Sequence, residues 1–283
     1  MSERDIIERT QGYPATVESL SADFCALGVA PGMVVLLHSS LSALGWVCGG
    51  PVTVILALET AIGEQGTLVM PTHSGDLSDP APWKNPPVPE AWWDVIRESM
   101  PPYDPDLTPT RGVGVVPETF RKQRGVLRSG HPRVSFAAWG ARAREITEGH
   151  ALDFELGEGS PLARVYDLDG WVLLLGVGHG NNTSLHLAEY RTSHPGCQVV
   201  ETRAPMLVNG RREWVAMRDV ELDESDFEEI GECLARATGC VRCGQVAGAK
   251  ALLMPQRALV DFAVKWMEEN RHSRVTPARD TTR

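Results

Sequence analysis

The apolar positions near the amino terminus first follow a helical spacing and then become continuous. Leu20, Phe24 and Leu27 recur at intervals of four and three residues, and Gly28 interrupts the pattern, which is typical of an amphipathic helix that ends at a glycine. A continuous apolar run over residues 33–37 follows and predicts a buried strand. The chain therefore opens with a helix and then a strand.

Two further units combine an apolar run with a helix. An apolar helix is predicted over residues 52–62 and a strand over residues 66–70. The apolar run over residues 171–177 also predicts a buried strand, and a glycine-rich turn separates it from a helix predicted over residues 185–191. Strands that pass through a tight turn into a helix amino terminus often carry catalytic or binding residues.

A hairpin is predicted in the last third of the chain. Asn209 and Gly210 separate alternating stretches at residues 206–208 and 213–219. Asn-Gly favours a two-residue type I′ turn, because both central residues of that turn need a positive φ. We therefore expect a β-hairpin near residues 204–219.

The whole pattern indicates an α/β fold. Helices predicted over residues 225–237 and 256–269 complete a layered α/β/α domain with a central mixed sheet. Residues 71–117 lack periodicity and contain more than half of the 20 prolines, so we expect a long insertion that helps to bind a ligand. With 283 residues, the chain is near the upper limit for one domain, predicted over residues 1–275 with a flexible tail at residues 276–283.

Composition narrows the possible partners. The formal net charge of −10 disfavours binding to nucleic acid or an anionic membrane and favours a cationic ligand, although many bacterial proteins are acidic. No run of about 18 apolar residues predicts a membrane span, and the amino terminus is too charged for a secretory signal. We expect a cytoplasmic protein, and the six scattered cysteines are expected to be reduced.

One histidine and two carboxylates are candidates for catalysis. His186 falls in the first turn of the predicted helix that follows the glycine-rich turn, where the helix dipole helps to keep an imidazole neutral. Asp219 and Glu221 end the second hairpin strand and leave the same face of an extended chain, so either one is a candidate to orient the histidine. On the residue pattern alone, a structural histidine and solvated strand-end acids are the more common case.

Other sequence signals are weak. The turn over residues 176–180 resembles a nucleotide-binding turn, which leaves a methyltransferase-like enzyme as an alternative. Cys240 and Cys243 have the spacing of metal ligands but lack a second pair, so no metal site is predicted. Because no G-x-S-x-G elbow is present either, direct transfer is favoured over a covalent intermediate.

Several stretches of the chain, in order, resemble motifs of the aminoglycoside 3-N-acetyltransferase family over nearly the whole sequence. They are LHSSLSALG at 37–45, GTLVMPT at 66–72, HPRVSFAAWG at 131–140 and NTSLHLAE at 182–189, with shorter matches at 108–112, 159–162 and 259–263. The resemblance points to a fold unrelated to that of the common small acetyltransferases. It implies transfer of acetyl from acetyl-CoA to the 3-amine of the deoxystreptamine ring of an aminoglycoside.

The resemblance also implies roles for particular residues. The histidine of the HLAE stretch is the general base, which is His186 here, and the supporting carboxylates are Asp219 first and Glu221 second. The loop that binds the coenzyme corresponds to His38, Ser39, Ser40, Leu41, Ser42, Ala43, Leu44 and Gly45, with Ser135 and Thr183 added. Donors for the thioester oxyanion are expected in this loop or at Thr183.

The expected partners are small molecules. Ammonium groups of a polycationic antibiotic need carboxylates, and we expect these to be Asp76, Asp79, Glu118 and Asp223. The sequence leaves open whether the protein is a monomer or a homodimer. A second alternative is a relative that binds cationic ligands without catalysing a reaction.

Overall fold

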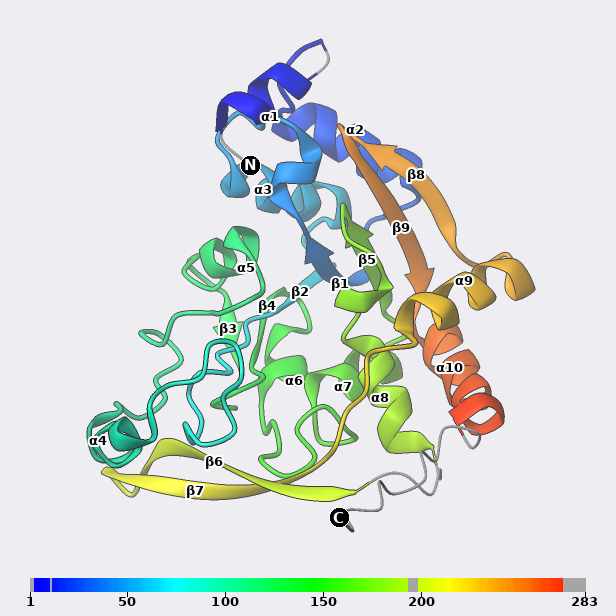
Figure 1. Ribbon diagram of the computed structural model, residues 1–283. Coiled ribbons are helices and arrows are strands. Elements are labelled where there is room, and N and C mark those ends of the chain that lie inside the picture. Colours follow the sequence, from blue (N-terminus) through cyan, green and yellow to red (C-terminus); the bar gives the residue numbers. More distant parts are fainter. Residues whose placement is uncertain (1–2, 11, 193–197, 272–283) are drawn as a thin grey trace.

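A mixed seven-stranded sheet forms the centre of the protein, which is described here by a computed structural model (Figure 1). The structure describes residues 3–10, 12–192 and 198–271, so the predicted tail lies outside the described residues. The strand order is β3-β4-β2-β1-β5-β9-β8. The strands are β1 (Val34–Ser39), β2 (Thr67–Pro71), β3 (Leu127–Arg128), β4 (Phe136–Gly140), β5 (Trp171–Leu175), β8 (Arg242–Val246) and β9 (Ala249–Pro255).

The central strand β1 lies between two parallel neighbours. Val34 pairs with Thr67 of β2, and Ser39 pairs with Leu175 of β5. The outer pairs, β2 with β4 and β5 with β9, are antiparallel. The parallel strands β2 and β5 flank β1 on opposite sides. The carboxyl ends of β1 and β5 therefore border the kind of crevice in which open α/β sheets bind ligands.

Helices cover both faces of the sheet, as predicted. Along β1, Val35 and Leu37 pack into one core and Val34 and Leu36 into the other, because successive side chains of a strand point to opposite faces. The first face carries α2 (Val17–Leu27), α3 (Pro51–Ile62) and α5 (Val115–Phe120). The second face carries α6 (Ala143–Thr147), α7 (Pro161–Asp167), α8 (Ser184–Arg191), α9 (Phe227–Thr238) and α10 (Gln256–Asn270).

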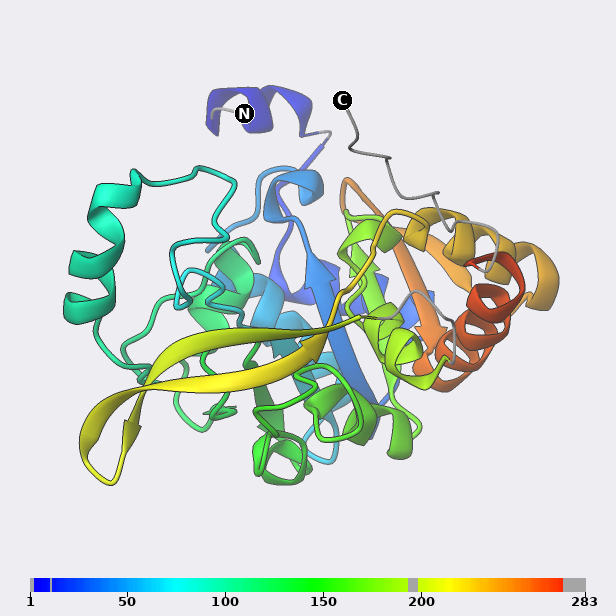
Figure 2. The same cartoon turned by 60° about the horizontal axis from the view of Figure 1, so that its bottom comes forward.

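The predicted hairpin is confirmed and extends beyond the sheet (Figure 2). Strands β6 (Val199–Val208) and β7 (Arg211–Val220) pair over their whole length. Asn209 and Gly210 have φ values of 50° and 76°, which is the conformation that a type I′ turn requires. The hairpin forms a separate two-stranded sheet.

The proline-rich segment, residues 71–117, leaves the main sheet after Pro71 at the end of β2 and packs against this hairpin. The backbone amides of Asp79 and Tyr103 donate to carbonyls of β6, and Trp214 of β7 donates to the carbonyl of Arg97. Arg97 belongs to α4 (Trp93–Ser99), a helix of this segment that lies beside the tip of the hairpin (Figure 1). The other short elements are α1 (Glu3–Arg9), η1 (Leu41–Leu44), η2 (Glu90–Trp92) and η3 (His179–Asn181).

Candidate active site

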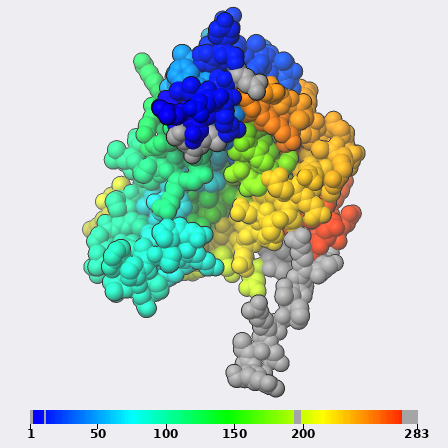
Figure 3. Space-filling view, turned by 45° about the horizontal axis from the view of Figure 1, so that its top comes forward, coloured from blue at the N-terminus to red at the C-terminus, as the bar shows by residue number. Residues whose placement is uncertain are grey.

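A cavity of about 750 Å³ lies at the carboxyl ends of β1 and β5. Figure 3 shows a hollow between the cyan proline-rich segment and the green and yellow parts of the chain. The turn after β5 is close to the loop after β1 because Gly176 has a φ of 69° and no side chain. A Cβ at this position would lie 2.4 Å from the Cβ of Ala43, so only glycine fits the turn.

His186 reaches the cavity from the first turn of α8. The Oδ1 atom of Asn182 accepts a hydrogen bond from the amide of Ser184, the first residue of this helix. The Nδ1 atom of His186 lies 2.6 Å from Oε2 of Glu189, on the same helix. The ring of His186 also packs edge-on against Phe227 of α9, with 4.9 Å between centroids.

Glu189 connects His186 to a buried network of charges. Its Oε1 atom is 2.7 Å from Nη1 of Arg271 and accepts a hydrogen bond of 2.9 Å from the backbone amide of Asp223. Arg271 also binds Asp226 through two hydrogen bonds. The side chains of Glu189 and Arg271 are 3% and 6% exposed, so the buried charge of Glu189 needs this ion pair for compensation, while Arg271 has Asp226 as a second partner.

This arrangement corrects the prediction for the partner of His186. Asp219 instead accepts a hydrogen bond from the hydroxyl of Tyr190 at 2.6 Å, and Glu221 is exposed. The carboxylate that binds the imidazole comes from the same helix as the histidine and not from the hairpin. Sequence reasoning missed Glu189, although its spacing of three residues from His186 places both side chains on one face of a helix.

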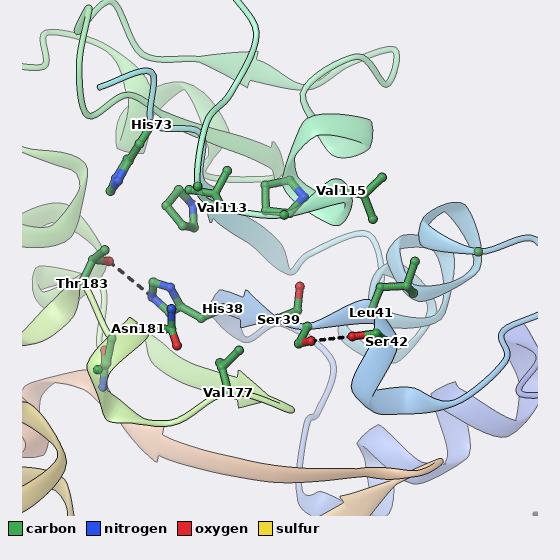
Figure 4. A pocket seen from close by; sticks show the side chains of 18 of the residues that line it. His38, Ser39, Leu41, Ser42, His73, Val113, Val115, Val177, Asn181 and Thr183 are labelled. Carbon is green, nitrogen blue, oxygen red and sulfur yellow. Dashed lines mark hydrogen bonds between the residues drawn. The ribbon is translucent and has the colours of Figure 1, made fainter. Parts of the chain in front are cut away.

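Two more histidines line the cavity (Figure 4). Nε2 of His38, at the end of β1, is 3.3 Å from Oγ1 of Thr183. Burial lowers the pKa of His38 to about 3, and the nearby His186 contributes to this shift. Burial likewise lowers the pKa of His73 to about 3, with contributions from both of these histidines. His38 and His73 are therefore neutral near pH 7.

The loop after β1 contributes much of the wall. Ser40 and Ser42 share a hydrogen bond of 3.2 Å between their hydroxyls, while Oγ of Ser39 is buried without a hydrogen-bonding partner (Figure 4). Of the ten residues expected to bind the coenzyme, seven line the cavity: His38, Ser39, Ser40, Leu41, Ser42, Gly45 and Thr183. Ala43 and Leu44 line a neighbouring pocket.

Ser135 is the expected coenzyme residue that lies outside this region. It is fully buried, and its hydroxyl contacts Thr72 and accepts from Nε of Arg128. These contacts hold β4 against the segment that follows β2, so the structure gives Ser135 a structural role.

The acids expected to bind the substrate do not line the main cavity. Asp79 pairs with Arg97, and Asp76 lies 3.4 Å from Arg111. Glu118 makes more contacts than either of these acids. It binds Arg121, Lys122 and the amide of Thr110. Although its partial burial acts in the opposite direction, these contacts hold the pKa of Glu118 well below its usual range.

Asp223 is also held away from the cavity. Its Oδ1 atom accepts from the amide of Ser225, while its own amide donates to Glu189. The carboxylates that do line the cavity are Glu3 and Glu224, neither of which was expected from the sequence. Glu224 follows Asp223 in the acidic run after the hairpin, so the run was visible, but which side chain faces the cavity depends on tertiary packing.

Metal clusters and membrane spans are both absent from the described part of the chain. Over residues 3–10, 12–192 and 198–271, no group of three or more His, Cys, Asp or Glu side chains is arranged to hold a metal ion. In the same ranges, every helix is too short or too polar to cross a bilayer.

The chain matches known proteins along most of its length. A profile of the family described as aminoglycoside 3-N-acetyltransferase matches residues 36–268. The SPbeta prophage-derived aminoglycoside N(3′)-acetyltransferase-like protein YokD of Bacillus subtilis is 46% identical over 94% of this chain and 97% of its own length. Aminoglycoside N(3)-acetyltransferase VII of Streptomyces paromomycinus is 38% identical over 95% of this chain and 96% of its own.

Solved structures show the same relationship. AAC-IIIb in a binary complex with CoASH superimposes with a TM-score of 0.81 and 35% identity, covering 91% of this chain and 97% of that one. AAC-VIa bound to sisomicin gives a TM-score of 0.81 and 31% identity, covering 92% and 100%. The protein therefore belongs to the aminoglycoside 3-N-acetyltransferase family.

Proposed function

We propose that the protein transfers acetyl from acetyl-CoA directly to the 3-amino group of the deoxystreptamine ring of an aminoglycoside, with His186 as the general base. The observation that carries this proposal is the pair formed by His186 and Glu189 at the wall of the main cavity. Family membership supports the reaction, since relatives are named for it and one is solved with CoASH. Because acetyl-CoA is an intracellular metabolite, we place the reaction in the cytoplasm.

The hydrogen bond at Nδ1 determines what His186 can do. A carboxylate accepts a proton, so Glu189 favours the tautomer with hydrogen on Nδ1 and a lone pair on Nε2. Nε2 would take the proton that the amine loses as its nitrogen attacks the thioester carbon. Glu189 would then stabilise the imidazolium until its proton passes to the departing thiolate.

The walls of the cavity suit the coenzyme. The hydroxyls of Ser40 and Ser42 supply hydrogen bonds for a polar chain, and Gly50 at the amino terminus of α3 lies in the same lining. Pro51 has no amide hydrogen and the amide of Gly50 donates to Val47, but the next amides at the start of α3 have no partner within the helix and attract phosphate. Acetyl-CoA would contribute the activated thioester, and these groups would hold it with its acetyl end toward His186.

The oxyanion that forms on the thioester needs donors within the cavity. Ser39 is one candidate, because its buried hydroxyl has no hydrogen-bonding partner. Thr183 is another candidate, since its hydroxyl is 3.3 Å from Nε2 of the neutral His38 and could donate to the oxyanion in place of this long contact. A fixed donor of this kind contributes about 100-fold or more to a rate.

Glu224 and Glu3 are the proposed partners of substrate ammonium groups, in place of the four acids expected from the sequence. They line the cavity, and His38 and His73, which line it too, are neutral and add no positive charge to it. Sisomicin and a gentamicin are bound in relatives. An aminoglycoside is therefore the first substrate to test.

The proposal is tested by following CoA release with a thiol reagent for the wild type and for His186→Ala. Loss of the base should lower kcat by about 100-fold or more, while stabilisation of the protein by CoA is retained. Wild-type levels of turnover in a folded His186→Ala enzyme would refute the base assignment. Aminoglycoside binding without turnover in the wild type would support the non-catalytic alternative, and S-adenosylmethionine binding the methyltransferase-like one.

The same proteins test direct transfer. Wild-type protein is incubated with acetyl-CoA alone and examined by mass spectrometry, with the His186→Ala protein as the comparison. An unmodified chain is expected. A stoichiometric acetyl adduct that an aminoglycoside then removes would show a covalent intermediate.

A further inference from the structure

A second cavity of about 410 Å³ lies beside the main one. His73 lines both, so the two cavities meet at this residue. Figure 4 shows His73 across the main cavity from Thr183 and His38. We call this second cavity the basic pocket; it is lined by His73, Gly75, Asp76, Trp83, Lys84, Asn85, Pro86, Arg111, Arg133 and Val134.

The charge of the basic pocket is opposite to that of the whole chain. Its lining has three cationic side chains, from Lys84, Arg111 and Arg133, against the single carboxylate of Asp76, whereas the chain has a net charge of −10. Asp76 is 3.4 Å from Arg111. No ion pair with Lys84 occurs within the described ranges. An excess of positive charge therefore remains in the pocket.

Arg133 is also incompletely compensated. Its Nε atom is buried without a hydrogen-bonding partner, and its ion pair with Glu155 is loose, with 3.5 Å between Nη1 and Oε2. Burial, together with the neighbouring carboxylate of Asp219, raises the pKa of Glu155, which weakens its compensation of the Arg133 charge. The guanidinium thus keeps donor capacity and charge for a ligand.

From these contacts we propose that the basic pocket binds an anionic group, a phosphate or a carboxylate, on an amine that His186 presents for acetylation. The neutral imidazole of His73, whose Nε2 atom has no partner, offers a hydrogen bond at the junction without repelling either end of such a molecule. An ammonium group would be repelled by the three cations. The inference rests on the proposed acetyl transfer and adds acceptors with an acidic substituent to the polycations.

Binding is tested with inorganic phosphate by calorimetry in a chloride buffer. The variant is Lys84→Gln with Arg111→Gln, both outside the catalytic pair. Its control is Lys265→Gln with Arg236→Gln, which removes two exposed cations from α10 and α9. We expect phosphate to bind the wild type and the control, and the pocket variant to bind it about tenfold more weakly. No binding, or equal binding by all three proteins, would overturn the proposal.

A second arm identifies the molecule that supplies the anion. Glucosamine and glucosamine 6-phosphate differ by one phosphate, and the wild type should prefer the phosphorylated amine by about tenfold in kcat/KM. The pocket variant should lose this preference while acetylating an aminoglycoside as before. If saturating CoA abolishes phosphate binding, the pocket belongs to the coenzyme and the proposal is wrong. If no amine of either class is acetylated while phosphate binds in the pocket, the proposed function fails and the anion site stands.

Discussion

Glu189→Gln is the sharpest test of the charge network behind the proposed base. The substitution keeps the size of the side chain but replaces a carboxylate that touches both Nδ1 of His186 and Nη1 of Arg271. An amide can turn its NH2 toward Nδ1, and His186 would then carry its hydrogen on Nε2. In that tautomer the atom that should accept the proton from the amine has no lone pair.

The size of the effect follows from these contacts. The corresponding carboxylate-to-amide change in a Ser-His-Asp triad costs about 10⁴ in kcat. The nitrogen of the attacking amine becomes ammonium-like as its bond to the thioester carbon forms, and it then gives up its proton more easily than a serine hydroxyl does. We therefore expect a smaller loss of about 10² to 10³, equivalent to about 3–4 kcal/mol of activation free energy. Arg271 keeps two hydrogen bonds to Asp226, which limits the loss of folding free energy to about 2 kcal/mol.

The assay compares CoA release and thermal unfolding for three proteins. Glu158→Gln is the matched control. Glu158 pairs with Arg191, which lies on the same helix as Glu189, but the side chain of Glu158 is 65% exposed. The Glu158→Gln protein should retain the wild-type kcat, and its free energy of unfolding should fall by less than about 1 kcal/mol. A folded Glu189→Gln enzyme with more than about a third of the wild-type kcat would refute the tautomer argument, since the amide would then be an adequate partner for His186.

Three further changes test other parts of the structure. Burial and the neighbouring Asp219 raise the pKa of Glu155 above its usual value of 4.5, so the ionised form is disfavoured in the folded state and stability is lost as the pH rises above that value. Glu155→Gln should therefore raise the free energy of unfolding by about 2 kcal/mol at about pH 8 and hardly at all at about pH 4.5. Equal gains at both pH values would contradict this. Gly231→Ala places a Cβ 2.2 Å from the ring of His179, so the free energy of unfolding should fall by about 2 kcal/mol. The control Gly130→Ala adds a Cβ with no neighbour within 4 Å and should change the free energy of unfolding little. Ser39→Ala should lower kcat by about 10-fold to 100-fold with KM for acetyl-CoA nearly unchanged, and an unaffected kcat would remove Ser39 from the oxyanion donors.

Much of the fold was predictable because local patterns coincide with tertiary burial. The helix that ends at Gly28 and the Asn209-Gly210 hairpin occur where predicted, since a left-handed cap and a type I′ turn depend on a few adjacent residues. The strands β8 and β9 were missed. Most of β8 is exposed at the edge of the sheet, so its glycine, cysteine and glutamine give no apolar alternation to detect.

The site was less predictable than the fold. His186 and the loop after β1 carry their own sequence signals, and Glu189 could have been found from helix geometry alone. Asp219 was an equally plausible carboxylate in the sequence, and only tertiary packing decides that it binds Tyr190 instead. Arg271 is far from His186 in sequence, so no local pattern connects the two.

The place of Arg271 in the chain has a consequence for synthesis of the protein. The arginine follows α10, and its guanidinium compensates the carboxylate that holds His186. A nascent chain released before residue 271 would have the cavity walls and the histidine but an uncompensated Glu189. Catalytic competence should therefore arise late, when α10 docks beside α8, and a ribosome-bound series of increasing length would register the docking of this helix as the onset of turnover.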